Sequence, residues 1–259
     1  MIVKEIKEVS RDDVTRYEVV LQFEGEQTCL WFEIDQVNAW CFERGRIDGI
    51  IVMLLPELLL RGEDVISELP CSERLWYSLT KTVIPVLVSS SKGRLKHIEI
   101  KCPLIHTAYS HDRKSATGMS LGIDAMYTYY RHLEGCPPNF EVELLCYFNH
   151  GAHNDGYTKN SIQMRESYEE GRRVVSEFAA LERRSFLACD TNLDEILPIN
   201  YTNTHTFRTA GIALLFQKEI SNYFYSSGFG MDDFSINPFD DSAMPLKAEY
   251  AKISYIPFE

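Results

Sequence analysis

The stretch from residue 116 to residue 125 has the composition of an anion-binding turn. It reads Ala-Thr-Gly-Met-Ser-Leu-Gly-Ile-Asp-Ala, so a short strand of small residues runs into a tight turn and then into a predicted helix. Such a junction presents backbone N–H groups and a helix N-terminus to a negatively charged ligand. Gly122 permits a positive φ or a close approach of phosphate oxygens. The stretch is therefore the first candidate for a phosphate-binding site.

Two side chains of this turn add chemistry to it. The Ser120 hydroxyl can donate a hydrogen bond to a phosphate oxygen. Asp124 can cap the helix, hold Mg²⁺ or hold an attacking group. The alternative is purely structural, because many strand-to-helix turns in α/β proteins contain Ser, Gly and Asp for capping alone.

Residues 120–125, Ser-Leu-Gly-Ile-Asp-Ala, resemble the SGGxDS signature of the PP-loop ATP pyrophosphatases, the adenine nucleotide α-hydrolase-like superfamily. Ser120, Gly122 and Asp124 match the signature, whereas Leu121 replaces its second glycine and Ala125 replaces its closing serine. The resemblance implies a Rossmann-like sheet whose first strand leads into a loop that grips the pyrophosphate part of ATP. It also implies that a substrate oxygen attacks the α-phosphate, which forms an adenylated intermediate and releases pyrophosphate.

The resemblance implies roles for a wider set of residues. The loop residues expected to contact ATP are Thr117, Gly118, Met119, Ser120, Leu121, Gly122, Asp124 and Ala125. The residues expected to contact it from the ends of later strands are Phe148, Asn149, His150, Asp190, Ser226 and Ser227. The expected catalytic residues are Asp124, Ser120 and Arg208, and the expected Mg²⁺ ligands are Asp124, Asp232 and Asp233. Structural interpretations remain open, such as an Asx turn at Asp190 or a solvated loop at Asp232 and Asp233.

The elements that must position these residues follow from the hydrophobic pattern. From about residue 106 onward, strands are predicted at 114–119, 141–148, 186–189 and 222–225, and helices at 125–133, 161–184 and 206–220. This alternation predicts a parallel sheet with right-handed crossovers, in which ligands bind at the carboxyl ends of the strands. We therefore expect an α/β fold with a parallel sheet over residues 106–259, and the resemblance implies that this sheet is Rossmann-like and of the PP-loop type.

The first 105 residues have a different pattern, which predicts a small α+β domain. Alternation over residues 17–23 and 28–32, around Glu24-Gly25-Glu26, indicates a β-hairpin. A helix is predicted at 48–60, kinked or divided at Pro56, and a second is predicted from Ser72 as its N-cap, kinked or ended at Pro85. Residues 94–101 alternate as a strand.

Composition restricts the class of partner. The net charge of −12 and the absence of a basic stripe disfavour tRNA or DNA as the main partner, although Mg²⁺ and a few local cations can neutralise a triphosphate. The longest apolar run, residues 49–56, is too short to span a bilayer, and the charged N-terminus does not resemble a signal peptide. The seven cysteines form no CxxC pair and indicate reduced thiols, so a cytoplasmic protein is expected.

The sequence therefore supports two functional hypotheses. The first is an ATP- and Mg²⁺-dependent, AMP-forming ligase or synthetase that adenylates a carbonyl or carboxylate oxygen of a small molecule or peptide. The second is a catalytically degenerate relative that acts as a binding or scaffold subunit. Under either hypothesis, a homo-oligomer or a complex with a partner subunit is compatible with the sequence. Leu121 and Ala125 favour the second, because a leucine Cβ restricts φ and can block a phosphate, and alanine donates no hydroxyl. An α/β protein with no nucleotide ligand is the third alternative.

Overall fold

The computed structural model describes residues 1–226 apart from residues 12, 24, 107–108, 110–111, 134, 138–139, 153–160 and 200. Within this part of the chain, nine strands form one mixed sheet in the order β11-β8-β9-β10-β3-β2-β1-β4-β6, and β5 and β7 form a small second sheet. The strands are β1 Ile2–Arg11, β2 Val14–Phe23, β3 Glu26–Asp35, β4 Val65–Ser67, β5 Cys71–Ser72, β6 Ile100–Lys101, β7 Leu104–Ile105, β8 Lys114–Gly118, β9 Val142–Asn149, β10 Ser185–Thr191 and β11 Ile220–Phe224.

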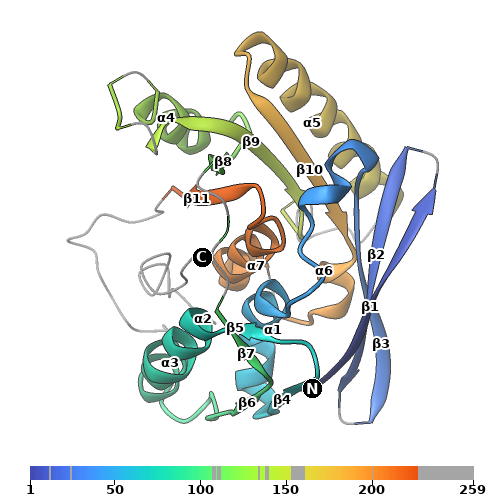
Figure 1. Cartoon of the computed structure of the whole chain (residues 1–259), viewed down its shortest axis with the longest axis vertical. Helices are drawn as coiled ribbons and strands as arrows, with labels where there is room; N and C mark the ends of the chain where they lie inside the picture. The colour runs from blue at the N-terminus through green and yellow to red at the C-terminus, as the bar shows by residue number, and fades with distance from the viewer. Residues whose placement is uncertain are drawn as a thin grey trace.

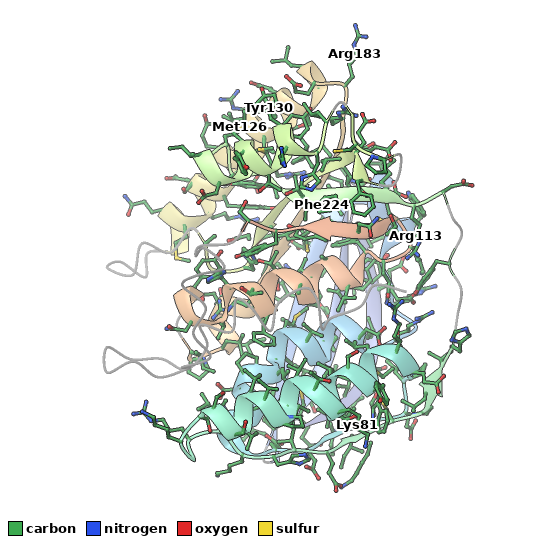
Figure 2. The ribbon with its side chains drawn as sticks, turned by 90° about the vertical axis from the view of Figure 1, so that its left-hand side faces the viewer. Lys81, Arg113, Met126, Tyr130, Arg183 and Phe224 are labelled. Atoms are coloured by element: carbon green, nitrogen blue, oxygen red, sulfur yellow. The ribbon has the colours of Figure 1, made fainter. Side chains whose placement is uncertain are left out.

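The helices cover both faces of this sheet. They are α1 Asp48–Arg61, α2 Glu73–Ser78, α3 Ile84–Ser90, α4 Ile123–Arg131, α5 Ser161–Leu181, α6 Leu193–Ile196 and α7 Tyr201–Leu215, with a 3₁₀ helix η1 at Gln36–Cys41 and a π-helical turn η2 at Leu79–Val83. Figure 1 shows α4 and α5 together at one end of the molecule, with α7 and α1 at its centre. Viewed from the side, α4 lies above the strands and α7 and α1 lie beneath them (Figure 2).

Four neighbouring strands form the parallel part of the sheet. β8 pairs with both β9 and β11, β9 pairs with β10, and all three pairings are parallel. The chain moves from β8 to β9 and β10 on one side, and then returns to place β11 on the other side of β8. The strand order therefore reverses between β8 and β11, which is where open α/β sheets bind their ligands. The fold is mixed α/β and compatible with a Rossmann-like arrangement.

Side-chain alternation along β9 separates two apolar layers. Leu145 and Tyr147 pack into a cluster with residues of α4 and α5, whereas Cys146 and Phe148 pack into the main core with α7 and α1. This is the period-two pattern of a strand that is buried on both faces. The buried run predicted at 141–148 is thus confirmed as a central strand.

The N-terminal strands extend the same sheet. The predicted hairpin is confirmed, because β2 and β3 pair antiparallel with Val20 opposite Cys29. β3 then pairs antiparallel with β10, with Glu33 opposite Asp190. On one face, α1 packs against α7 where Gly49 and Gly211 meet, and a Cβ at Gly49 would lie 2.4 Å from the Gly211 carbonyl oxygen. One sheet and one core therefore cross the predicted division between residues 105 and 106.

Some predicted boundaries are wrong. Only Ile100–Lys101 of the predicted strand at 94–101 pairs with the sheet. The N–H groups before it bond elsewhere, because Lys96 donates to the Leu59 carbonyl of α1 and Glu99 donates to the Asp64 carboxylate. Of the two outcomes predicted at Pro85, a kink or an end, the helix that starts after Ser72 does not end there. It passes through the π-helical turn at Leu79–Val83 directly before α3, which is a local departure from α-helical hydrogen bonding next to the proline.

Helix α1 also continues through Pro56, and it is buried along almost its whole length. None of the helices in the described ranges is both long and apolar enough to cross a bilayer. All seven cysteines are free, and Cys41, Cys71, Cys146 and Cys189 are buried.

Candidate functional site

A pocket of about 320 Å³ lies at the carboxyl ends of β8, β9 and β11, and we call it the β8–β11 pocket. It is bounded by the turn after β8, the first turn of α4, the end of β9 and one side of α7. Its volume is at the lower end of the range for small-molecule sites. The pocket coincides with the reversal of strand order between β8 and β11, so it is the place where this architecture is expected to bind a ligand.

The turn after β8 has a defined backbone geometry. The Met119 N–H donates a 2.8 Å hydrogen bond to the Cys146 carbonyl, which fixes the start of the turn to β9. The Gly122 N–H donates to the Ser120 hydroxyl oxygen at 3.3 Å, and Gly122 is the N-cap of α4 without a side-chain cap. The first-turn N–H groups of a helix have no acceptor within the helix, so this junction can hold an anion.

The positive φ of this turn is at a different residue from the one expected. Gly122 has φ −75°, whereas Leu121 has φ +59°. Leucine in the left-handed region carries a conformational cost of about 1–2 kcal/mol. The Leu121 side chain packs against the apolar cluster beneath α4 and α5 and does not line the β8–β11 pocket. The expectation that its side chain occupies the phosphate space is therefore wrong.

Hydroxyl groups tie the pocket wall on the β11 side to its neighbours. The buried Thr117 hydroxyl donates to the Phe224 carbonyl at 2.8 Å, so it joins β8 to β11. The Ser226 hydroxyl lies 2.9 Å from the Asp124 carbonyl and also contacts the Thr128 hydroxyl, so it joins the end of β11 to α4. The hydroxyl groups of Thr117 and Ser226 therefore have structural partners already.

The α7 side of the pocket is aromatic and polar. Tyr201, His205 and Thr209 line it from successive turns of α7. The buried His150 ring is joined to Thr209 by a 2.8 Å hydrogen bond at Nε2, and His205 is hydrogen-bonded to the hydroxyl of Tyr225. This side offers flat ring surfaces with polar edges, which suits a planar heterocycle.

Tyr223 lies at the base of the pocket with its hydroxyl buried. The residue is 5% exposed, and its hydroxyl oxygen has no hydrogen-bond partner among the residues that the structure describes. A Cβ placed on Gly118, at the end of β8, would lie 2.8 Å from this oxygen. Burial raises the pKa of Tyr223 well above its usual value, so the hydroxyl keeps its proton.

Arg208 lies in the interior of α7 and does not line the pocket. Its guanidinium donates to the His150 carbonyl at 2.8 Å, to the Ile199 carbonyl at 2.7 Å and to the Thr204 hydroxyl at 2.8 Å, and it pairs with Asp194 at 2.6 Å. No part of its side chain is exposed. The guanidinium therefore holds three chain segments together and does not face the pocket, which differs from the catalytic position implied by the resemblance.

Asn149 and Asp190 face a second cavity of about 850 Å³, which we call the β9–β10 cavity. Asn149 donates a 2.7 Å hydrogen bond to Asp190, which also accepts the Thr191 N–H at 2.8 Å. Burial raises the pKa of the Asp190 carboxyl above its usual value, against these two hydrogen bonds. This cavity lies on the α5 face of the sheet, where Met164 and Glu169 of α5 line it. Side chains alternate along β9, so Asn149 points to this face while Phe148 points to the opposite one.

The expected magnesium ligands are only partly described. Asp124 is exposed at the mouth of the β8–β11 pocket and is the only carboxylate among the described residues that line it. In the described ranges no group of three or more His, Cys, Asp or Glu side chains forms a metal site. Ser227, Asp232 and Asp233 lie outside the described residues. One carboxylate together with ligand phosphates is a common way to hold Mg²⁺, and the exposed Asp124 fits that arrangement.

The structure brings nine of the expected residues together in the β8–β11 pocket. They are Thr117, Gly118, Met119, Ser120, Asp124, Ala125, Phe148, His150 and Ser226. The pocket residues of α7 and the role of the β11 tyrosines were not predicted. The i, i+4 spacing of Tyr201, His205 and Thr209 was the available signal, because it places three polar or aromatic side chains on one helix face.

Comparison with known proteins adds no relative. A scan against protein-family models, a search of curated proteins and a search of solved structures each gave no match for this chain.

Proposed function

We propose that this chain binds an adenine nucleotide in the β8–β11 pocket. The phosphate groups would lie at the turn between Gly118 and Ile123, and the base would lie against the aromatic side chains of α7 and β11. The observation that carries the proposal is the position of the pocket where the strand order reverses, directly above a strand–turn–helix junction. The partial match of residues 120–125 to the PP-loop signature supports adenine as the base.

The reaction that this resemblance supports is adenylation of an acceptor. An acceptor carboxylate or carbonyl oxygen would form a bond to the α-phosphorus of ATP, and the bond to the pyrophosphate leaving group would break. Backbone N–H groups of the turn and the Ser120 hydroxyl would hold the phosphate oxygens. Asp124 would hold Mg²⁺, which neutralises phosphate charge. The acidic chain favours a small molecule or a peptide as acceptor over a nucleic acid.

A second candidate is nucleotide binding without turnover. One observation favours it: Arg208, the cation expected to act on the phosphates, is buried and paired with Asp194. Among the described residues that line the pocket, none is Lys or Arg. A site built from neutral donors can hold a nucleotide, but it gives less stabilisation to the charge that develops during phosphoryl transfer.

Calorimetric titration tests the proposed binding. Unchanged protein should bind AMP, ATP or pyrophosphate at millimolar concentrations or below, and no binding of any of the three would refute the proposal. Asp124→Ala should weaken ATP binding about tenfold in the presence of Mg²⁺, because a metal ligand is lost. Without Mg²⁺ the same variant should bind ATP as well as the unchanged chain or better, because a carboxylate beside the phosphates is removed.

Asp190→Ala is the matched control, since Asp190 lies in the β9–β10 cavity. Equal effects of the two substitutions, with both variants folded, would argue against the placement of phosphate at this turn. The two candidate functions are then separated by product analysis. Formation of AMP and pyrophosphate from ATP with candidate carboxylate acceptors supports adenylation, whereas binding without either product supports the second candidate.

A further inference from the structure

Tyr223 is the one tyrosine of the β8–β11 pocket whose hydroxyl is buried with no hydrogen-bond partner in the described ranges. Leaving a buried hydroxyl unpaired costs free energy, so native structures rarely retain such a group without a use for it. Side chains alternate along β11, and Phe224 faces α4, as Figure 2 shows. Tyr223 and Tyr225 therefore face α7 and the pocket.

The position of this hydroxyl favours one part of a ligand. Gly118 ends β8 and begins the turn, and a Cβ on this glycine would lie 2.8 Å from the Tyr223 oxygen. The hydroxyl is thus beneath the turn that we propose for the phosphates. Tyr201, His205 and Tyr225 also line the pocket, from α7 and from the end of β11.

The chemistry of the group also favours an anion. A tyrosine held protonated in a buried site is a hydrogen-bond donor at every ordinary pH. No Lys or Arg lines the pocket in the described part of the chain, so a neutral donor there would stabilise a phosphate oxygen without an ion pair. Hydrogen bonds to charged acceptors are about twice as strong as those between neutral groups.

We propose that the Tyr223 hydroxyl donates a hydrogen bond to an oxygen of the nucleotide phosphate nearest the ribose. This inference rests on the proposed nucleotide function and adds a residue that determines specificity for a phosphorylated ligand. It requires that the Tyr223 hydroxyl does not stabilise the protein in the absence of ligand. The same group should matter for AMP and should not matter for adenosine, which lacks the phosphate.

The test compares Tyr223→Phe with Tyr17→Phe. Tyr17 is a buried tyrosine of β2 whose hydroxyl donates to the Ala39 carbonyl at 3.0 Å, outside the pocket. Without ligand, Tyr223→Phe should keep or raise the melting temperature, whereas Tyr17→Phe should lower it by about 2–4 °C. Calorimetry should show AMP affinity falling about 10- to 100-fold in Tyr223→Phe and remaining unchanged in Tyr17→Phe. Adenosine, measured by displacement of a fluorescent AMP analogue, should lose less than twofold in affinity for either variant.

The outcomes separate this inference from the function on which it rests. If the unchanged chain binds neither AMP nor ATP, the proposed function fails and this inference fails with it. If the unchanged chain binds AMP and Tyr223→Phe binds it equally well, only this inference is overturned. An equal loss for AMP and adenosine would assign the hydroxyl to the base or ribose and would overturn the phosphate contact. A melting temperature that falls in Tyr223→Phe as it does in Tyr17→Phe would show that the hydroxyl already has a partner.

Discussion

The guanidinium of Arg208 lies 2.6 Å from the carboxylate of Asp194, and none of the arginine side chain is exposed. The same guanidinium binds the His150 carbonyl, so an ion pair within the core positions the segment that follows β9. His150 lines the β8–β11 pocket, while Asp194 lines the β9–β10 cavity. Arg208 is therefore a positioning residue that supports the walls of both cavities.

Replacing Arg208 by methionine should destabilise the protein by about 3–5 kcal/mol, because the variant loses the ion pair with Asp194 and the donors to the buried carbonyls of His150 and Ile199. Denaturant unfolding measures this free energy. Arg173→Met is the control, because the partners of Arg173 among the described residues are exposed glutamates of α5, and its loss should leave stability almost unchanged. Equal effects in the two variants would contradict the structural role of Arg208.

A side chain added at Gly151 should strongly lower the stability of the folded protein. It has φ +108°, and an added Cβ would lie 2.6 Å from an Arg208 nitrogen and 2.7 Å from an Asp194 oxygen. Gly135 is the matched control, because it has φ +81° and no atom of the described residues lies within 4 Å of the added Cβ. Gly135→Ala should cost about 1–2 kcal/mol for its backbone conformation, and Gly151→Ala should cost at least twice as much, measured by chemical denaturation. Similar losses at both positions would show that the clash is relieved by a small movement.

At position 121, a glycine substitution should give a more stable protein than an alanine substitution, which is the reverse of the usual order within a helix. At φ +59° glycine is unstrained and alanine is not, so Leu121→Gly should be more stable than Leu121→Ala by about 1 kcal/mol. At Glu177, on the exposed face of α5, alanine should instead be more stable than glycine by a similar amount. Because the Leu121 side chain lies outside the pocket, Leu121→Gly should change AMP affinity less than twofold. A large gain in the AMP affinity of Leu121→Gly would instead indicate that the leucine side chain blocks the phosphate.

Asp190 should give an unusual pH dependence of stability. Burial raises the pKa of this carboxyl in the folded protein, so the favourable contribution of its protonated form is fully present below the usual pKa of 3.8. That contribution is lost as pH rises through the raised pKa of the folded state. Asp190→Asn should therefore gain stability relative to the unchanged chain as pH rises above about 4.

Asp64 should show the opposite sign. Hydrogen bonds from the Glu99 N–H and from Lys101 lower the pKa of its carboxyl, so its contribution is present above 3.8 and is lost as pH falls through the lowered pKa. Asp64→Asn should be less stable than the unchanged chain at neutral pH, and the difference should shrink in acid. Unfolding curves collected between pH 3 and pH 7 compare the two variants, and parallel behaviour would contradict one of the two pKa directions.

Local pattern predicted the strand–turn–helix junction at β8 and α4, because capping, small residues and periodicity all act within about ten residues. The positions of Phe148 and His150 on one face and Asn149 on the other also follow from strand alternation. All three residues were nevertheless predicted to lie in one site, although the alternation of the strand is visible in the sequence. The long-range partners of Arg208 could not be predicted, because Asp194, Ile199 and His150 meet it only when the sheet and α7 are assembled.

The antiparallel pairing between β3 and β10 has a consequence for synthesis and folding. Glu33 meets Asp190 across more than half of the chain length, so β3 remains an unpaired strand edge until the ribosome has released β10. A nascent or truncated chain that stops near residue 180 exposes that edge together with the apolar faces of β2 and β3. Such fragments should aggregate. In the complete chain, the pairing between β3 and β10 should form late in folding.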